Sequence, residues 1–335
     1  MGFDEGRKLE IDAKLSELAR TDPAPLQSTV DAVIAELRAA ARDAADASKA
    51  PATERAYAGD WRDFRAFCGS IGRVGLPAEP ETVALYIADL AARGRRPATI
   101  ARKLATIGIY HKAAGFDPPT AHGVVRDVER GYRRKLGVAQ QQKTALVRDP
   151  LLVVLAPIAD DLRGLRDRAL ILVGWAAALR RSELAALEVR DFVFEREGAV
   201  IAIRRSKRDQ EGEGEEVAIA FAADFTQCAV HALQAWLAAG ALAEGNVFRS
   251  IDRHGTDGAN LSPWAIGEIV KSRVAAAGLA GDFGAHSLRS GFATSAARGG
   301  FGEAAIMKHG RWKSVAVARR YIRAGNRWDQ SVSVL

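Results

Sequence analysis

The chain has 335 residues, and its 48 lysines and arginines against 41 aspartates and glutamates leave a formal net charge of +7. This length allows two ordinary domains with a sizeable core, and the excess of positive charge favours an anionic partner, of which nucleic acid is the simplest. Two cysteines exclude a disulfide scaffold and a four-cysteine zinc site, no apolar stretch is long enough to span a bilayer without charges, and the acidic, amphipathic N-terminus is unlike a signal peptide.

The first 50 residues hold amphipathic helical stretches that Pro23 and Pro25 interrupt, followed by an alanine-rich run of small residues. Proline cannot continue a helix, and a run of alanine and small polar residues is typical of a linker or a frayed helix end. We therefore expect residues 1–50 to form an N-terminal extension that is helical and partly flexible.

Residues 51–139 carry a helical pattern throughout. Apolar side chains recur at the spacing of one buried helix face in four segments. Thr53 can cap the first helix, Gly94 can end the second, and Pro97 can open the third. The fourth runs from about 121 to 136, and the outer faces carry arginine and lysine, so we expect a compact helical domain with basic faces. The positions expected to be buried are Tyr57, Trp61, Phe64, Cys68, Val83, Tyr86, Ile87, Leu90, Ile100, Leu104 and Ile107.

Residues 140–148 begin with a polar Gln-Gln-Gln-Lys run, which predicts an interdomain linker. Asp149 followed by Pro150 is a typical helix start, and two helices are expected up to about residue 187. The periodicity then changes. Three short strands joined by turns that contain glycine are predicted at 191–195, 199–205 and 216–220, and the chain is expected to be helical again after about 224. The whole chain is thus predicted to be mainly α, and the second domain, 149–335, to hold a small three-stranded antiparallel sheet.

Four short segments of the second domain stand out together because they gather arginine, lysine, histidine, tryptophan and tyrosine at regular spacings. The first is Ala-Leu-Arg-Arg-Ser-Glu-Leu at 178–184, and the second is a lysine in the charged connection between two predicted strands. The third is a histidine with an arginine three positions later, on one face of a predicted helix, and the fourth is a tryptophan nine positions before a tyrosine. The candidate catalytic residues are Arg180, Glu183, Lys207, His286, Arg289, Trp312 and Tyr321.

These segments together resemble the tyrosine recombinase, or integrase, family, whose motifs they match in order and spacing. Trp312, at a position where other members have histidine, and the string Arg-Arg-Tyr-Ile-Arg-Ala-Gly around Tyr321 are most similar to recombinases of the Cre type. The likeness extends from about Ala52 to Tyr321. It implies an N-terminal helical core DNA-binding domain over 51–139 and a catalytic domain over 149–335.

The resemblance implies a reaction that needs no metal, nucleotide or other cofactor. Tyr321 would attack the phosphodiester and form a covalent 3′-phosphotyrosine. This link keeps the energy of the broken bond, so rejoining needs no ATP. Because DNA phosphate is anionic, the reaction also needs positive charge, and Arg180 and Arg289 can each make bidentate bonds to the non-bridging oxygens.

The other candidate positions take supporting roles by their place in the family. Lys207 is expected to protonate the leaving 5′ oxygen, His286 to assist with the tyrosine proton, and Glu183 to support His286. Trp312 is expected to pack its ring and to donate its indole N–H to a phosphate oxygen. Taken alone, Arg180 with Glu183 would be a surface ion pair, and a charged connection such as the one around Lys207 is usually only solvated.

Candidate DNA contacts come from charge and from position in the family. Basic residues of the first domain are expected to face outward and bind phosphates, which positions a protein without reading base sequence. The helix after Ser262 is where the family has a helix that enters DNA, although an ordinary amphipathic helix has the same pattern. The candidates are Arg102 and Lys103 in the first domain and Trp264, Glu268 and Lys271 in the second.

The sequence therefore predicts a site-specific DNA recombinase of the cytoplasm, associated with the nucleoid when it is bound to DNA and without contact to a membrane. The resemblance implies double-stranded DNA with inverted-repeat sites as the partner, and a homotetramer on two such sites. The apolar end of the chain, with Val332, Val334 and Leu335, could dock in a neighbouring subunit or pack on its own. Two alternatives remain open: a DNA-relaxing topoisomerase with similar tyrosine chemistry, and a sequence-specific DNA-binding protein without catalysis.

Overall fold

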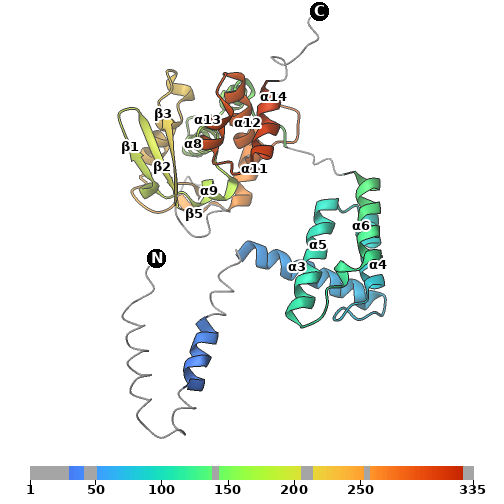
Figure 1. The fold of residues 1–335 in the computed structure, drawn as a ribbon. Helices are drawn as coiled ribbons and strands as arrows, with labels where there is room; N and C mark the ends of the chain where they lie inside the picture. The colour runs from blue at the N-terminus through green and yellow to red at the C-terminus, as the bar shows by residue number, and fades with distance from the viewer. Residues whose placement is uncertain (1–29, 41–50, 138–142, 205–213, 253–256, 327–335) are drawn as a thin grey trace, which may run out of the picture. The chain divides into compact units, whose positions relative to one another are not determined.

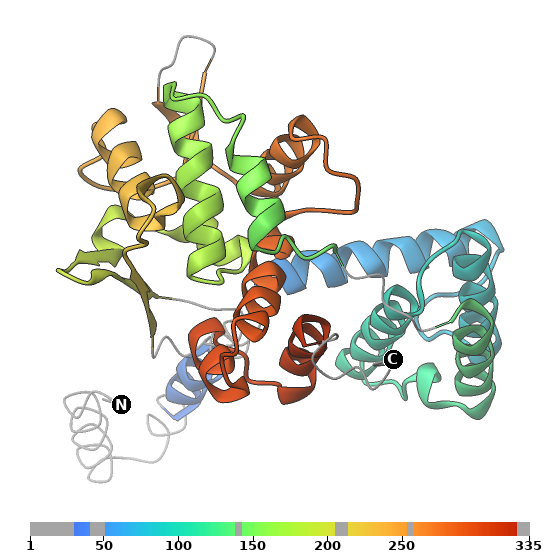
Figure 2. The same cartoon turned by 90° about the horizontal axis from the view of Figure 1, so that it is seen from above.

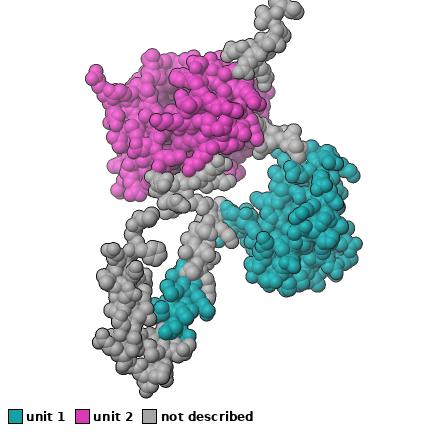
Figure 3. All heavy atoms as spheres, viewed as in Figure 1, with its two compact units in different colours: residues 1–140 teal, residues 141–335 magenta. Residues whose placement is uncertain are grey.

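A computed structural model describes residues 30–40, 51–137, 143–204, 214–252 and 257–326 of the chain. The chain separates into two compact units, Met1–Gln140 and Gln141–Leu335 (Figure 3). Residues 30–40 form a helix. Much of the expected extension 1–50, the start of the expected linker and Lys207 lie outside the described residues. The assignment of DNA binding to 51–139 and of catalysis to 149–335 stays a prediction.

The first unit packs its helices around one apolar core. Within residues 51–137 the elements are α3 (Pro51–Ser70), α4 (Pro80–Ala92), α5 (Pro97–Ala113), the 3₁₀ turn η1 (Pro119–Ala121) and α6 (Gly123–Leu136). Helices α4 and α6 run side by side, as the view from above shows (Figure 2). Phe64, Tyr86 and Ile107, all predicted to be buried, are at most 1% exposed. The expectation that Thr53 caps the first helix is wrong, because that helix already begins at Pro51.

The predicted three-stranded antiparallel sheet lies at one edge of the second unit (Figure 1). Its strands, in the spatial order β1-β2-β3, are β1 (Phe192–Phe194), β2 (Gly198–Ile203) and β3 (Glu215–Ala220). Ile201 is the Cα partner of Phe192 on one side and of Val217 on the other. All three side chains are buried, so this face of the sheet contributes to the core.

The helices of the second unit form the rest of its core. They are α7 (Arg148–Leu155), α8 (Leu162–Ala176), α9 (Arg181–Ala186), α10 (Ala229–Ala239), α11 (Pro263–Ala276), α12 (Ala285–Arg298), α13 (Glu303–Gly310) and α14 (Val315–Gly325), with 3₁₀ turns η2 (Val189–Asp191) and η3 (Phe225–Gln227). The residues Ala169 to Val173 of α8 are all buried, which places this helix at the centre. None of the helices in the described ranges combines the length and the apolarity needed to cross a membrane.

Three details of the second unit differ from the prediction. Helices α7, α8 and α9 precede the sheet where two were expected. Asp149 lies inside α7, whose N-cap is Val147, so the carboxylate adds negative charge to the first turn without capping it. The region after 224 also contains a two-stranded antiparallel sheet, β4 (Arg249–Ile251) with β5 (Asp257–Asn260), which the short, polar sequence did not indicate.

Helix α12 lies very close to the chain segment that enters the second unit. The backbone N–H of Leu146 donates to the carbonyl oxygen of Ser287 over 2.9 Å, and the indole N–H of Trp175 donates to the carbonyl oxygen of Leu146 over 2.9 Å. A Cβ atom added to Gly291 would lie 1.9 Å from that same Leu146 oxygen. Glycine at this position therefore allows the backbone contact that fixes α12.

Replacing Gly291 with alanine is expected to lower the free energy of unfolding of the second unit by about 1–3 kcal/mol, because the added methyl group collides with backbone that cannot move aside freely. The matched control is Gly131→Ala in α6, where an added Cβ meets no atom within 4 Å. It should raise stability by up to about 1 kcal/mol through helix propensity. Urea unfolding followed by circular dichroism measures both changes, and a gain in stability for Gly291→Ala would contradict the packing argument.

Candidate active site

The second unit brings together all the predicted catalytic residues that the structure describes. Arg180 lies in the turn between α8 and α9, and Glu183 lies in the first turn of α9. Helix α12 carries the predicted histidine and arginine, and the predicted tryptophan follows α13. Tyr321 lies on α14, which packs against α12. Lys207 falls in residues 205–213, outside the described residues, so its position relative to the others is still a prediction.

Tyr321 and His286 form a hydrogen-bonded pair. The phenol oxygen of Tyr321 lies 2.9 Å from Nε2 of His286. Burial raises the pKa of Tyr321, with the positive charges of Arg289 and Arg320 acting in the opposite direction. The imidazole keeps an exposed edge, but partial desolvation and then the charges of Arg289 and Arg180 lower the pKa of His286. A neutral imidazole at neutral pH can accept the phenol proton, so the pair has the chemistry of a nucleophile with its base.

Arg289 is a buried cation whose Nη2 amino group has no hydrogen-bond partner in the part of the chain that the structure describes. Its side chain is 2% exposed, and its guanidinium stacks 4.1 Å from the centre of the Trp312 ring. Nη1 donates to the carbonyl oxygen of Ala178, whereas Nη2 has no hydrogen-bond partner among the described residues. Burial and then the charge of Arg180 lower the pKa of Arg289 to about 9, which leaves it a cation at neutral pH. A buried donor without a partner is costly, so this N–H is suited to an anionic ligand.

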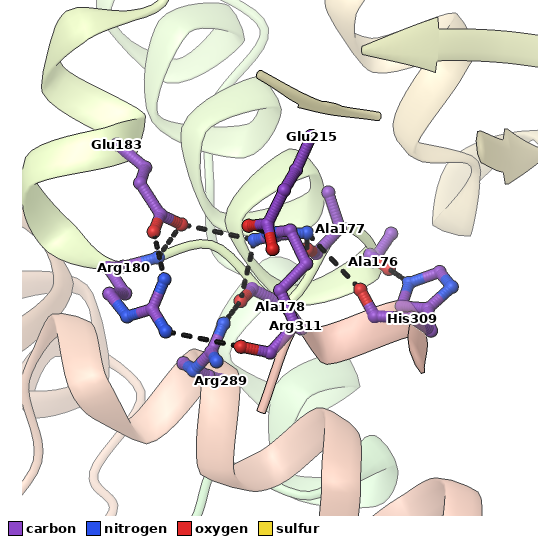
Figure 4. Close-up of polar contacts among 9 residues, drawn as sticks. All are labelled: Ala176, Ala177, Ala178, Arg180, Glu183, Glu215, Arg289, His309 and Arg311. Atoms are coloured by element: carbon purple, nitrogen blue, oxygen red, sulfur yellow. Dashed lines mark hydrogen bonds and ion pairs between the residues drawn. The ribbon is translucent and has the colours of Figure 1, made fainter. Parts of the chain in front are cut away.

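Glu183 is bonded to two arginines, and its expected support of His286 stays a prediction. It is 3% exposed. One carboxylate oxygen accepts from Nη1 of Arg180, and the other accepts from the Arg180 backbone N–H over 2.8 Å and from Nη2 of Arg311 over 3.0 Å (Figure 4). Burial raises the pKa of Glu183, but the Arg180 amide and the two guanidinium charges more than offset this, and the net direction is downward.

Trp312 reaches the site because glycine precedes the turn that carries it. A Cβ atom on Gly310 would lie 1.7 Å from the Trp312 ring. The ring packs at 6.1 Å from the ring of Tyr321 and is 8% exposed. Ser314 is the N-cap residue of α14, although its side chain makes no capping hydrogen bond. The role of Trp312 as a phosphate donor is untested by these contacts.

Arg311 is a member of the site that the motif comparison missed. Its guanidinium is almost fully buried and lies between Glu183 and the turn at Ala177 and Ala178 (Figure 4). The backbone oxygen of Arg311 in turn accepts from Nη2 of Arg180 over 3.3 Å. Its place directly before Trp312 was the only signal in the sequence, and arginine gives no hint of a left-handed, buried position.

The candidate DNA contacts divide into two groups. Lys103 does not face outward as expected, because its side chain is 10% exposed and its ammonium pairs with Asp60 and Asp63. Arg102 is half-exposed and also pairs with Asp60. On α11, Ser262 caps the helix and the remaining three candidates follow at one-turn intervals on one face. They are Trp264, which is 69% exposed, and Glu268 and Lys271, which form an ion pair of 2.7 Å.

The arrangement can bind an anionic phosphate and attack it. Arg180 and Arg289 supply positive charge, and the Tyr321 phenol supplies a nucleophile with His286 beside it. Within the described ranges no three side chains of histidine, cysteine, aspartate or glutamate gather to hold a metal ion.

Comparison with known proteins supplies independent findings. The model of the phage integrase family matches residues 152–327. The chain is 41% identical to an integrase/recombinase XerD homologue from Selenomonas ruminantium over 83% of either chain. It is 26% identical to the recombinase Cre of Escherichia phage P1 over 78% of this chain and 81% of that protein. The predicted resemblance to tyrosine recombinases, including the Cre type, is thereby confirmed.

Solved structures agree on the fold. A lambda integrase dimer bound to a core site matches with a TM-score of 0.59 and 16% identity, covering 100% of this chain and 91% of that one. The integrase of the transposon Tn1549, in complex with a circular intermediate DNA, matches with a TM-score of 0.52 and 16% identity over 72% and 80% of the two chains. The predicted mainly α fold with a small antiparallel sheet is confirmed.

The His286 imidazole should titrate below its ordinary pKa of 6.5 in the free protein, because desolvation and two neighbouring guanidinium charges disfavour its charged form. The unfolded chain then binds more protons than the folded one, so stability falls as the pH drops below about 6.5. Histidine NMR titration, with His286→Asn to assign the resonance, measures this. A pKa at or above 6.5 in the free protein would contradict the electrostatics of the site.

Proposed function

The chain belongs to the phage integrase family, and from that membership we propose that this site-specific recombinase cleaves and rejoins DNA through a covalent 3′-phosphotyrosine at Tyr321. The hydrogen bond between Tyr321 and His286, next to the unpartnered N–H of Arg289, carries the proposal. It joins a nucleophile, a base and an anion-binding donor in one place.

In the proposed reaction the Tyr321 phenol oxygen attacks phosphorus while the bond from phosphorus to the 5′ oxygen breaks. His286 takes the phenol proton, and Lys207 gives a proton to the leaving oxygen, which becomes a 5′-hydroxyl. Arg180 and Arg289 neutralise the charge that develops on the non-bridging oxygens, and Trp312 adds its indole N–H. Rejoining is the reverse reaction with the 5′-hydroxyl of the exchanged strand as nucleophile.

The assembly we propose follows the family. Residues 51–139 bind DNA, residues 149–335 carry catalysis, and residues 140–148 link these two domains. Four subunits assemble on two inverted-repeat sites at the nucleoid. In the second unit, the face of α11 that carries the exposed Trp264 is the proposed DNA contact. In the first unit Arg102 is a better candidate than Lys103, whose charge is already buried in an ion pair. The apolar end of the chain lies outside the described residues, and its docking stays a prediction.

Tyr321→Phe should abolish a covalent protein–DNA complex on a nicked suicide duplex, because phenylalanine has no oxygen to attack phosphorus. The duplex is built from a site selected out of a random pool by the protein itself, and the complex is read as a band shift on a denaturing gel. Tyr132→Phe, in α6 of the first unit, is the matched control and should react like the unchanged protein.

A covalent complex with Tyr321→Phe would overturn the nucleophile assignment. No complex with the unchanged protein on its selected site would favour the non-catalytic binding protein. Relaxation of a supercoiled plasmid that lacks the site would favour a topoisomerase.

Lys207→Ala should slow cleavage by about 10²–10⁴-fold, because the 5′ oxygen then leaves without its proton donor. A substrate with sulfur in place of the bridging 5′ oxygen should restore most of the rate, since a thiolate leaves without protonation. Arg208→Ala is the neighbouring control, and its cleavage rate should fall less than that of Lys207→Ala. Equal loss by Lys207→Ala on oxygen and sulfur substrates would assign the acid role to another group.

A further inference from the structure

Arg311 has a backbone conformation that arginine rarely adopts. Its φ of 56° and ψ of 43° lie in the left-handed region, which favours glycine. Its side chain is 2% exposed, so a full positive charge is also withdrawn from water. Both features cost free energy, and such a residue persists only where its contacts compensate.

The guanidinium of Arg311 ties together three segments. Nη1 donates to the carbonyl oxygens of Ala177 and His309, each over 3.2 Å, and Nη2 donates to Glu183 over 3.0 Å (Figure 4). Nε lies 3.7 Å from a carboxylate oxygen of Glu215, on strand β3. The turn after α8, the start of α9 and the end of α13 are thereby linked through a single side chain.

Ala178 connects Arg311 to the phosphate-binding arginine of α12. Ala178 is itself left-handed, with a φ of 48°. Its carbonyl oxygen accepts from Nη1 of Arg289 and, over 3.5 Å, from Nη2 of Arg311. The two guanidinium groups therefore share an acceptor, and the position of Arg289 depends on a turn that Arg311 also contacts.

Glu183 divides its carboxylate between Arg180 and Arg311. The Arg180 side chain is 23% exposed and the Arg311 side chain 2%, so Arg180 is the one that a substrate can reach. Arg311 and the Arg180 backbone N–H share one oxygen of Glu183, and Nη1 of the Arg180 guanidinium binds the other. Nη2 of Arg180 donates instead to the backbone oxygen of Arg311 over 3.3 Å.

We propose that Arg311 is a positioning residue for DNA cleavage, which acts through Glu183 on Arg180 and through the Ala178 turn on Arg289. This rests on the proposed recombinase function. Without the Arg311 side chain, the Glu183 oxygen that it now binds would keep the Arg180 backbone N–H as its partner, and the uncompensated carboxylate charge would draw the Arg180 guanidinium toward Glu183, away from the phosphate. The site would also lose one of three arginine charges against one glutamate, falling from a net +2 to +1 for these four residues.

The test uses Arg311→Gly in the full chain, because glycine accepts the left-handed backbone while the side chain with its guanidinium is removed. The rate of covalent-complex formation on the selected nicked duplex should fall on the order of 100-fold, as expected for misplaced catalytic groups. Adding Glu183→Gln to Arg311→Gly removes the uncompensated carboxylate, so the double variant should react faster than Arg311→Gly alone. Arg311→Lys keeps the positive charge but not the planar guanidinium with its several N–H donors, and it should react at an intermediate rate.

Ala241→Gly is the matched backbone control. Ala241 is an exposed residue with a φ of 48° outside the site, and its replacement should leave the cleavage rate unchanged. Cleavage by Arg311→Gly at the unchanged rate would overturn the proposal. So would a double variant no faster than Arg311→Gly, since a purely structural role is not rescued by removing a charge. If Arg311→Gly fails to fold, the lysine variant decides, and a rate equal to that of the unchanged protein overturns the proposal.

The unchanged protein, run in parallel, separates the two claims. Its failure to form any covalent complex counts against the recombinase function, and the positioning role falls with it. Its success together with full activity of Arg311→Gly counts against the positioning role alone.

Discussion

The site depends on one buried carboxylate, that of Glu183, shared between two guanidinium groups. A phosphate-cleaving site must collect positive charge before its substrate arrives, and like charges about 4 Å apart repel by about 4 kcal/mol in a protein-like dielectric. Glu183 offsets this repulsion for Arg180 and Arg311 while remaining ionised, as its lowered pKa indicates. Arg289 is not bound by this carboxylate. Its Nη2 group has no hydrogen-bond partner among the described residues and is therefore available to a ligand.

The fold supplies this arrangement through close backbone contacts. Helix α12 holds Arg289 and His286, and it approaches the segment at Leu146 so closely that only glycine fits at 291. Gly310 in the same way lets the Trp312 ring fold back toward the site. Helix α14 then brings Tyr321 to His286. The proposed nucleophile lies on α14, and the proposed base lies with one arginine on α12, so the packing of α12 against α14 sets the distance between them.

The helices, the three-stranded sheet and the set of site residues could be predicted from the sequence, because they follow from regular spacing along the chain. Buried faces such as that of Phe64 follow from regular spacing, and six of the seven proposed catalytic residues do meet in the described part of the second unit. The second arginine partner of Glu183, Arg311, was not predicted because it is distant in sequence and lies in a turn with no periodic signal. Lys103 was mispredicted because its acidic partners lie on another helix. Charge pairing of this kind depends on tertiary contacts, which spacing along one helix does not reveal.

In the proposed reaction Tyr321 becomes covalently joined to DNA. Mass spectrometry of the digested covalent complex tests it most directly. Trypsin cleaves after Arg320 and Arg323, so Tyr321 falls in the peptide Tyr-Ile-Arg. We expect a nucleotide adduct on Tyr321, on this peptide or on the longer one that a missed cleavage leaves. An adduct on any other residue, such as Tyr110 or Tyr132, would contradict it.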